Sequence, residues 1–493
     1  MKKILIALVL LVVAAVAAGP FLIGSQIEKI TKNLVEKGNS QLATLVESNP
    51  QFQSASVTLD SYEKGYLDAK ANGVLKVSLI GADESEGFTV PYTTEITHGP
   101  YLGDAGFGLA RIITRPDLTG FDLPEAINED TLIIEGVVDF KQGITETLTV
   151  APIKHVAEDG NTVDFAGAKI NSKSHVKNRL TFTADMNVEQ LTVSDGEQSN
   201  IITLKPFTMD MSGKGDGNMQ NGSYQATSSA IEASMGEGIS VVLQKMGLAG
   251  NYKQADGASF MLGDGNMSLQ ELVITNPAAF PTPLKIPELK FETKLEQAKN
   301  QDLTMSVKYQ GTLDPSMMRM MNSPVDVKTA EIDLQFKAIP LAAVTDYQKL
   351  VKELSSEPDP QKAAAQMQAR MFDFVQMLAQ NAASTNIKVN ATSAEGDLNA
   401  DINAGFKPGI DFDAAQMMQI LAAPDPSSIM PLLVGRGDVS LSKGVTDKAG
   451  LTPMIQIMAA EFVTLKDDKF VSELQITDGQ LMINGTPLPL APQ

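Results

Sequence analysis

The fold is indicated by stretches such as residues 303–309, Leu303-Thr304-Met305-Ser306-Val307-Lys308-Tyr309, in which apolar and polar side chains alternate. The same alternation occurs in residues 74–79 and 180–184, and clusters of Gly, Asp and Asn separate such segments. A period of two residues gives a β-strand one covered face and one wet face. Antiparallel sheets tolerate this arrangement, and parallel sheets generally do not. Residues 51–313 are therefore predicted to form a strand-rich region of antiparallel sheet.

Helices are expected mainly in residues 314–493, a region of mixed helix and strand. Asp359 is a predicted N-cap, because its side chain can accept hydrogen bonds from free backbone amides and Pro360 suits the first helical position. An apolar stripe at helical spacing then follows, formed by Met367, Met371, Phe374 and Leu378. A second helix is predicted to begin at Pro340, and a third to run from near Asp413 to Ala423. Strands are predicted between these helices at residues 387–390 and 439–441.

The predicted fold class is α+β. Extended antiparallel sheets are joined by amphipathic helices mainly in the C-terminal half, and an N-terminal transmembrane helix precedes them. A half-buried sheet of this extent must cover its apolar face with helices or with another sheet. Incomplete cover would leave a groove.

The first 25 residues are predicted to be a signal anchor. Lys2 and Lys3 precede residues 4–23, an uncharged run long enough to span the roughly 30 Å hydrocarbon core of a bilayer. The positive-inside tendency keeps the lysines in the cytoplasm and places the body outside it. Ala15-Val16-Ala17 resembles a cleavage pattern, so removal is the alternative. The apolar run nevertheless continues into an amphipathic stalk helix, residues 26–50, and this continuity favours retention.

Composition excludes several classes of function. The net charge of −20 over 493 residues argues against nucleic acid, whose phosphates require a basic surface. With no cysteine, the chain has neither disulfides nor thiol catalysis, which suits a bacterial periplasm. The expected location is the bacterial inner membrane, crossed once by residues 4–23, with the C-terminal body in the periplasm. Envelope proteins or lipid are the expected partners.

One short pattern recurs at residues 188–196, at residues 471–479 and, more loosely, at residues 269–276. Each copy reads as a strand that ends in a tight turn, where Asp or Asn, followed by Gly in the first two copies, tolerates positive φ. The spacing is irregular, so a solenoid is excluded. Duplication of a sheet unit and convergence on a common strand-turn pattern both remain open.

Two stretches carry a resemblance to a known family. Residues 62–67, Tyr62-Glu63-Lys64-Gly65-Tyr66-Leu67, precede residues 96–100, Ile96-Thr97-His98-Gly99-Pro100, and the chain ends with residues 479–485 as Gly-Gln-Leu-Met-Ile-Asn-Gly. In order and spacing these resemble the YdgA-like family of Gram-negative envelope proteins, whose function is unassigned. Lys64 stands where that family has Arg, and Ala69 where it has Ser. The resemblance implies inner-membrane anchoring and a periplasmic body, and it implies no reaction.

No residue is assigned a catalytic, cofactor-binding or metal-binding role. His98 has no adjacent partner and is interpreted as a structural histidine, hydrogen-bonded at a strand end. His155 and His175 lack metal-ligand spacing. Tyr62 is interpreted as a packing residue beside the turn glycine Gly65.

Two further motifs have simple structural interpretations. Residues 213–218 lack the remaining parts of a phosphate or calcium loop and are interpreted as a hairpin tip. Arg436-Gly437-Asp438 leads into a strand.

Methionine is unusually frequent, with 23 residues. Several lie in residues 317–321 and on predicted helix faces, namely Met367, Met371, Met377, Met417, Met418, Met454 and Met458. Flexible thioethers suit surfaces that accept varied apolar shapes, and they also fill cores that are poor in aromatic residues.

Two functions therefore remain: a non-enzymatic structural or interaction scaffold, or a carrier that shelters apolar ligands in a sheet-lined groove. A closed core would favour the scaffold, and a continuous apolar trough would favour the carrier.

Overall fold

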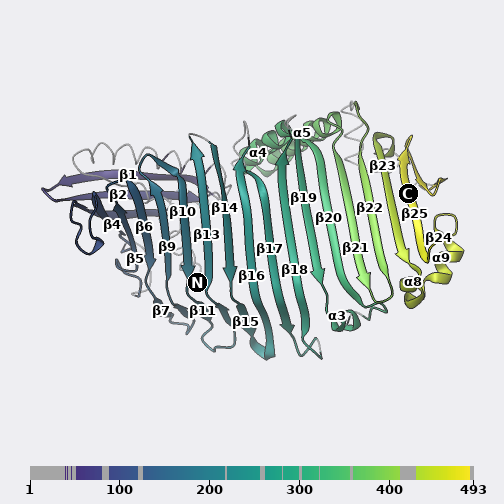
Figure 1. Cartoon of the computed structure of the whole chain (residues 1–493), viewed down its shortest axis with the longest axis horizontal. Coiled ribbons are helices and arrows are strands. Elements are labelled where there is room, and N and C mark those ends of the chain that lie inside the picture. The colour runs from purple at the N-terminus through teal and green to yellow at the C-terminus, as the bar shows by residue number, and fades with distance from the viewer. Residues whose placement is uncertain are drawn as a thin grey trace. The chain divides into compact units, whose positions relative to one another are not determined.

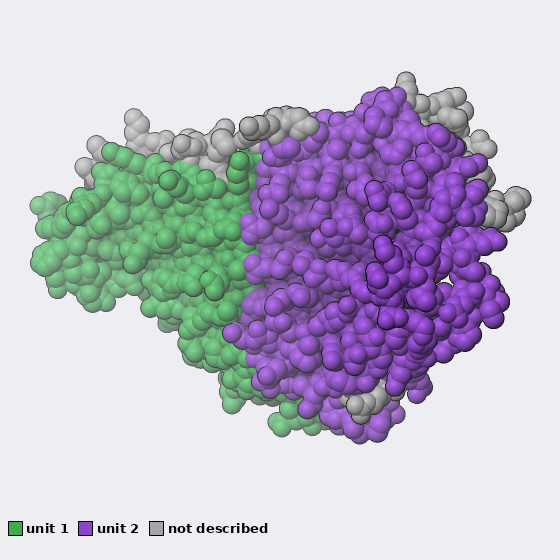
Figure 2. Space-filling view, turned by 45° about the vertical axis from the view of Figure 1, so that its right-hand side comes forward, with its two compact units in different colours: residues 1–237, 248–261 green, residues 238–247, 262–493 purple. Residues whose placement is uncertain are grey.

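The protein is described by a computed structural model that covers residues 39, 42, 46, 52–79, 88–119, 126–216, 219–255, 261–279, 281–298, 302–320, 322–355, 359–410 and 429–488. The chain forms two compact units (Figure 2). Unit 1 comprises residues 1–237 and 248–261, and unit 2 comprises residues 238–247 and 262–493. Antiparallel strands dominate both units (Figure 1).

In unit 1 the strands form two antiparallel series. One series runs β1–β2–β3–β4–β5–β6–β9–β10–β13–β14, and a second runs β7–β8–β11–β12–β15. The strands are β1 (Phe52–Lys64), β2 (Asp68–Leu79), β3 (Phe88–His98), β4 (Ala110–Pro116), β5 (Leu132–Val138), β6 (Gly143–Val150), β7 (Ile153–Val156), β8 (Thr162–Phe165), β9 (Ala168–His175), β10 (Asn178–Val188), β11 (Leu191–Ser194), β12 (Ile201–Leu204), β13 (Phe207–Asp216), β14 (Met219–Ser228) and β15 (Ile231–Met235).

The core of unit 1 follows from the alternation predicted in the sequence. In β4 and β5 every second side chain is buried, as a half-covered strand requires. The buried residues of β1–β6 form two apolar clusters, one around Val77 and Ile112 and one around Leu132 and Leu148. Leu42 belongs to the first cluster.

A tyrosine lies over a glycine at two places in unit 1. The hydroxyl of Tyr92 on β3 crosses Gly73 and donates to Thr58 O on β1 at 2.8 Å. Tyr252 crosses Gly222 in the same way and donates to Ser212 O at 3.4 Å. A Cβ at either glycine would lie about 2.4 Å from the tyrosine oxygen, closer than any real contact. Each glycine therefore provides the space in which an aromatic ring can cross a strand.

Unit 2 contains a single antiparallel series, β17–β18–β19–β20–β21–β22–β23–β25–β26, with β24 and β27 as short additions. The strands are β18 (Leu284–Gln297), β19 (Asp302–Thr312), β20 (Val327–Pro340), β21 (Ser384–Ser393), β22 (Asp397–Phe406), β23 (Leu433–Ser442), β24 (Thr464–Lys466), β25 (Lys469–Thr477), β26 (Gln480–Ile483) and β27 (Thr486–Pro487). The boundary between the units cuts β16 (Ile239–Gln254) and β17 (Met261–Thr275).

The α-helices whose bounds the structure describes all follow residue 314, in agreement with the prediction that helices concentrate in the C-terminal half. They are α3 (Pro315–Met320), α4 (Leu341–Ser355), α5 (Pro360–Gln380), α8 (Lys443–Ala449) and α9 (Thr452–Met458). The extended antiparallel sheet of the predicted fold class is confirmed, and the described residues contain few helices. The helices occupy connections between strands, and the strands reach 16 residues in length.

Local signals in the sequence predicted α4 and α5 correctly. Asp359 accepts from the amides of Gln361 at 2.9 Å and Lys362 at 3.4 Å, so it caps α5 with Pro360 at its first position. The strands at residues 387–390 and 439–441 are confirmed within β21 and β23. The helix predicted at residues 413–423 lies outside the described residues.

The recurrent strand-turn pattern is confirmed best at its C-terminal copy. Residues 471–477 belong to β25, and Asp478 and Gly479 both adopt positive φ, at 51° and 79°, in a two-residue turn into β26. The copy at residues 188–196 is divided between β10 and β11, and the copy at residues 269–276 ends β17. The three copies are therefore not equivalent structural units.

The signal anchor predicted at residues 1–25, including the span 4–23, lies outside the described residues. Within the described ranges, no helix combines the length and apolar character needed to cross a membrane. In the predicted stalk, residues 26–50, Asn39, Leu42 and Val46 are helical. The Asn39 amide pairs with the free edge of β1, donating to Val57 O at 2.9 Å and accepting from Val57 N at 2.7 Å. Through this pairing, Asn39 provides hydrogen-bond partners for backbone groups at the edge of the sheet.

Candidate functional site

The strand register of unit 2 separates apolar from charged side chains. Residues opposite one another in an antiparallel pair share a face, so the ladders identify both faces of the six strands β18–β23. The row through Phe291 continues through Tyr309, Ile332, Val389, Ala400 and Val439. The next row runs through Thr293, Val307, Leu334, Ile387, Ile402 and Gly437. We call this side of β18–β23 the apolar face.

Two further rows complete the apolar face. One consists of Leu289, Gly311, Ala330, Ala391, Leu398 and Leu441, and the other of Leu295, Met305, Phe336, Thr385, Ala404 and Gly435. Across all four rows the only polar groups are the hydroxyls of Thr293, Thr385 and Tyr309, and no side chain is charged. Alternation within single strands thus becomes one continuous apolar surface.

The centre of the apolar face remains accessible to solvent. Tyr309 is 49% exposed, Ile332 is 42% exposed and Ile387 is 37% exposed, although all three lie on interior strands of the sheet. None of the described residues packs over them closely enough to bury them. Contiguous exposed apolar surface of this kind marks an interaction or ligand site.

The opposite face of the same strands is polar and paired. Lys308 forms a salt bridge with Glu331 at 3.1 Å, and Lys388 forms one with Asp401 at 3.2 Å. The Glu331 carboxylate raises the pKa of Lys308, and the hydrogen bond from Asn386 lowers the pKa of Asp401, so these groups remain charged at neutral pH. The sheet therefore presents charges to water on one side only.

Helices close both ends of the strands in unit 2. Figure 1 shows α4 and α5 across one end and α3 near the other. On the α5 side, the Asn381 amide donates to Asp302 Oδ1 at 2.8 Å and to Ala338 O at 2.7 Å. On the α3 side, Met318 and Val325 are buried. The apolar face is therefore bounded along the strand direction and accessible in the middle.

The two stretches that carry the family resemblance meet at one end of unit 1. The turn at residues 64–68 lies beside the end of β3, where His98 N donates to Leu67 O at 2.8 Å. A Cβ at Gly65 would lie 1.8 Å from Asp68 Oδ1, so any larger residue there would displace the Asp68 carboxylate. Ala69 is buried opposite Ile96, and Tyr62 packs against the core, which confirms its predicted packing role.

His98 itself departs from the prediction. It lies at a strand end, but among the described residues neither ring nitrogen has a hydrogen-bond partner of normal geometry. Burial and the Lys64 ammonium lower its pKa, and the carboxylate and backbone of Asp68 oppose this effect. The expected ring hydrogen bond is therefore wrong, and the ring is held mainly as a neutral group.

The remaining sequence candidates lie apart from one another. His155 is on β7, His175 ends β9, and Arg436-Gly437-Asp438 lies within β23. Residues 213–216 end β13, where Asp216 pairs with Met219 to close a hairpin, while Gly217 and Asn218 lie outside the described residues. No three His, Asp or Glu side chains within the described ranges gather closely enough to hold a metal ion.

Comparison with known proteins places this chain in a family. Residues 1–238 and 207–491 match a family described as bacterial protein of unknown function (DUF945). The chain belongs to this family. No curated protein and no solved structure matches it. Family membership makes the protein bacterial and assigns no activity.

Alternation in the sequence identified several strands of unit 2, such as β19, β21 and β23, but it did not locate the apolar face that the strands form together. The alternation in residues 303–309 indicates only that one side of this strand is covered or apolar. Alignment of Val307 with Leu334 and Ile387 depends on register across three strands. The long connection through α4 and α5 separates two of those strands in sequence.

Proposed function

We propose that the protein binds acyl chains of lipids on the apolar face of unit 2. The observation that carries the proposal is the partial exposure of Tyr309, Ile332 and Ile387 at the centre of an uncharged, six-stranded surface. A closed core would have buried these side chains. The proposed role is that of a carrier or bridge, and it involves no chemical step.

The dimensions of the apolar face suit such a ligand. Neighbouring strands lie about 4.8 Å apart, so β18–β23 span about 24 Å. An acyl chain in one leaflet of a bilayer extends over about 15 Å, half the hydrocarbon core. Each methylene removed from water contributes about 0.8 kcal/mol, so a chain lying across several strands would be held without polar contacts.

Site-specific photo-crosslinking in intact cells tests this proposal with the full chain. Benzoylphenylalanine replaces Tyr309 on the apolar face or, as a matched control, Gln310, the next residue along β19 on the polar face. Both positions are exposed, so both report on their surroundings without a core being disturbed. We expect lipid adducts, identified by mass spectrometry, at position 309 and not at position 310.

Adducts that are equal at the two positions, or absent from position 309, would exclude acyl-chain binding by this face. Protein adducts at position 309 would instead support an interaction scaffold. That second candidate is favoured by one observation, an exposed apolar surface on α9 formed by Leu451, Met454, Ile457 and Met458. These flexible side chains suit a protein surface that accepts varied shapes.

We further propose that residues 4–23 anchor the chain in the bacterial inner membrane with its body in the periplasm. The support is the Lys2-Lys3 start before an uncharged run of spanning length, together with the YdgA-like resemblance. A tether of this kind would keep a carrier beside its source of lipid. N-terminal sequencing of membrane-extracted protein tests retention, since a start near Ala18 or Gly19 would mean that the segment is cleaved.

A further inference from the structure

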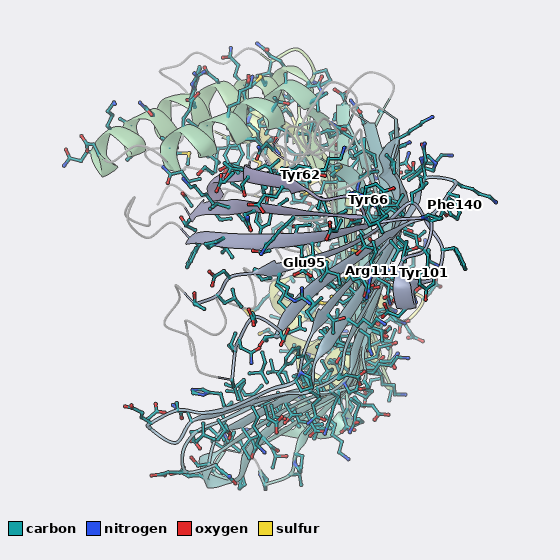
Figure 3. All side chains as sticks on the ribbon, turned by 90° about the vertical axis from the view of Figure 1, so that its left-hand side faces the viewer. Tyr62, Tyr66, Glu95, Tyr101, Arg111 and Phe140 are labelled. Carbon is teal, nitrogen blue, oxygen red and sulfur yellow. The ribbon has the colours of Figure 1, made fainter. Side chains whose placement is uncertain are left out.

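Large apolar side chains project from consecutive turns at one end of unit 1. Tyr66 and Leu67 lie in the β1–β2 turn, Tyr101 and Phe107 in the β3–β4 loop, and Phe140 in the β5–β6 turn. All five are exposed, Tyr66 to 95% and Phe107 to 73%. We call these five residues the aromatic rim. Figure 3 shows Tyr66, Tyr101 and Phe140 gathered at this end, near Arg111.

Backbone hydrogen bonds join the turns that carry the aromatic rim. Leu67 O accepts from His98 N at 2.8 Å, which links the first turn to the second. Leu109 N donates to Val138 O at 2.8 Å, which links the second to the third. The rim is therefore one contiguous surface rather than a set of separate exposed residues.

The β3–β4 loop is braced from within. Tyr101 and Phe107 pair as a β-bridge with their rings 5.6 Å apart, while Leu102 between them is buried. Arg111 ties the loop to the sheet, bonding Asp104 at 2.6 Å and Glu135 at 2.7 Å. The aromatic rings are thus held outward by a defined backbone and do not collapse onto the unit.

Charged side chains of both signs surround the aromatic rim, and Glu63 and Asp68 are exposed beside Lys64 in the first turn. Lys64 and Lys141 are exposed in the turns that carry Tyr66 and Phe140. Lys177 is exposed in the next turn, which joins the same end through Val176 N donating to Gln142 O at 3.0 Å. The nearby Asp104 is paired with Arg111, and Asp139 accepts from the amides of its own turn.

We propose that the aromatic rim docks on a phospholipid bilayer. Tyrosine favours the headgroup level and phenylalanine the outer acyl region, while lysine ammonium groups meet lipid phosphates. Side chains that project separately from turn tips can enter a fluid interface, whereas a folded partner would need a matching concavity for each ring. Docking would let a lipid carrier load, but it stands even if the apolar face binds no acyl chain.

Because the sequence contains no tryptophan, the fluorescence of a single introduced tryptophan can be measured without background from other tryptophans. Phe107→Trp creates a full chain with one tryptophan at the rim, and Ile202→Trp places one on β12, another exposed apolar position of unit 1. Each protein is reconstituted into vesicles of phosphatidylethanolamine and phosphatidylglycerol, with or without brominated acyl chains. We expect blue-shifted emission and quenching by the brominated lipid for Phe107→Trp only.

Tyr66→Trp repeats the measurement on a second turn, in case Phe107→Trp fails to fold as judged by circular dichroism. Emission at both rim positions that matches that of Ile202→Trp would overturn membrane docking and would leave a protein partner as the occupant. This readout is independent of photo-crosslinking at position 309. Either result can therefore fail while the other holds.

Discussion

At the scale of single residues, the pKa of His98 is set by the groups around the ring rather than by its position at the end of β3. The end of β3 that carries His98 lies beside the turn at residues 64–68. Burial of the ring and the Lys64 ammonium both disfavour the imidazolium, so they lower the pKa of His98. The unfolded chain then binds a proton more readily than the folded chain between that lowered pKa and about 6.5. The free energy of unfolding should therefore decrease as the pH falls below about 6.5.

The prediction for His98→Gln is a weaker response to acid, because the variant has no group to protonate at this site. Chemical denaturation from about pH 7.5 to about pH 5.5 should reduce the stability of the original chain more than that of the variant. His155→Gln is the control, since that side chain lies on β7, away from the turn. Equal acid sensitivity of all three proteins would show that His98 does not contribute.

At the scale of elements, α5 is the clearest case of local sequence deciding local structure. Asp359 supplies two of the bonds that the free amides of the first turn require. The start of α5 depends on this cap and on packing against α4, where Phe374 meets Tyr347 with ring centroids 5.7 Å apart.

Asp359→Ala should therefore cost about 1 kcal/mol in the stability of α5. Amide hydrogen exchange should accelerate in the first turns of the helix more than in β20 or β21. Asp373→Ala is the matched control, because it removes the same charge from an exposed position within α5 and leaves the cap intact. Identical exchange in the two variants would mean that α5 does not rely on its N-cap.

At the scale of the whole molecule, the proposed membrane topology depends on the N-terminal residues. The positive-inside tendency acts on Lys2 and Lys3 irrespective of how the units fold. An export-dependent reporter enzyme, such as one that is active only in the periplasm, should therefore be active when fused after Gln493. A reporter that works only in the cytoplasm should be inactive at the same position. The reverse pattern would contradict the proposed orientation.

The sequence by itself determined several individual elements. Alternation predicted the strands, Asp359-Pro360 predicted the start of α5, and Asp478-Gly479 predicted a turn with positive φ, because each of these signals acts over a few neighbouring residues. Only the tertiary structure decided the apolar face and the aromatic rim. Val307, Leu334 and Ile387 become neighbours through strand register, and Tyr66, Phe107 and Phe140 through hydrogen bonds between turns. Neither relation has a local signature, since both depend on pairing between segments far apart in the chain.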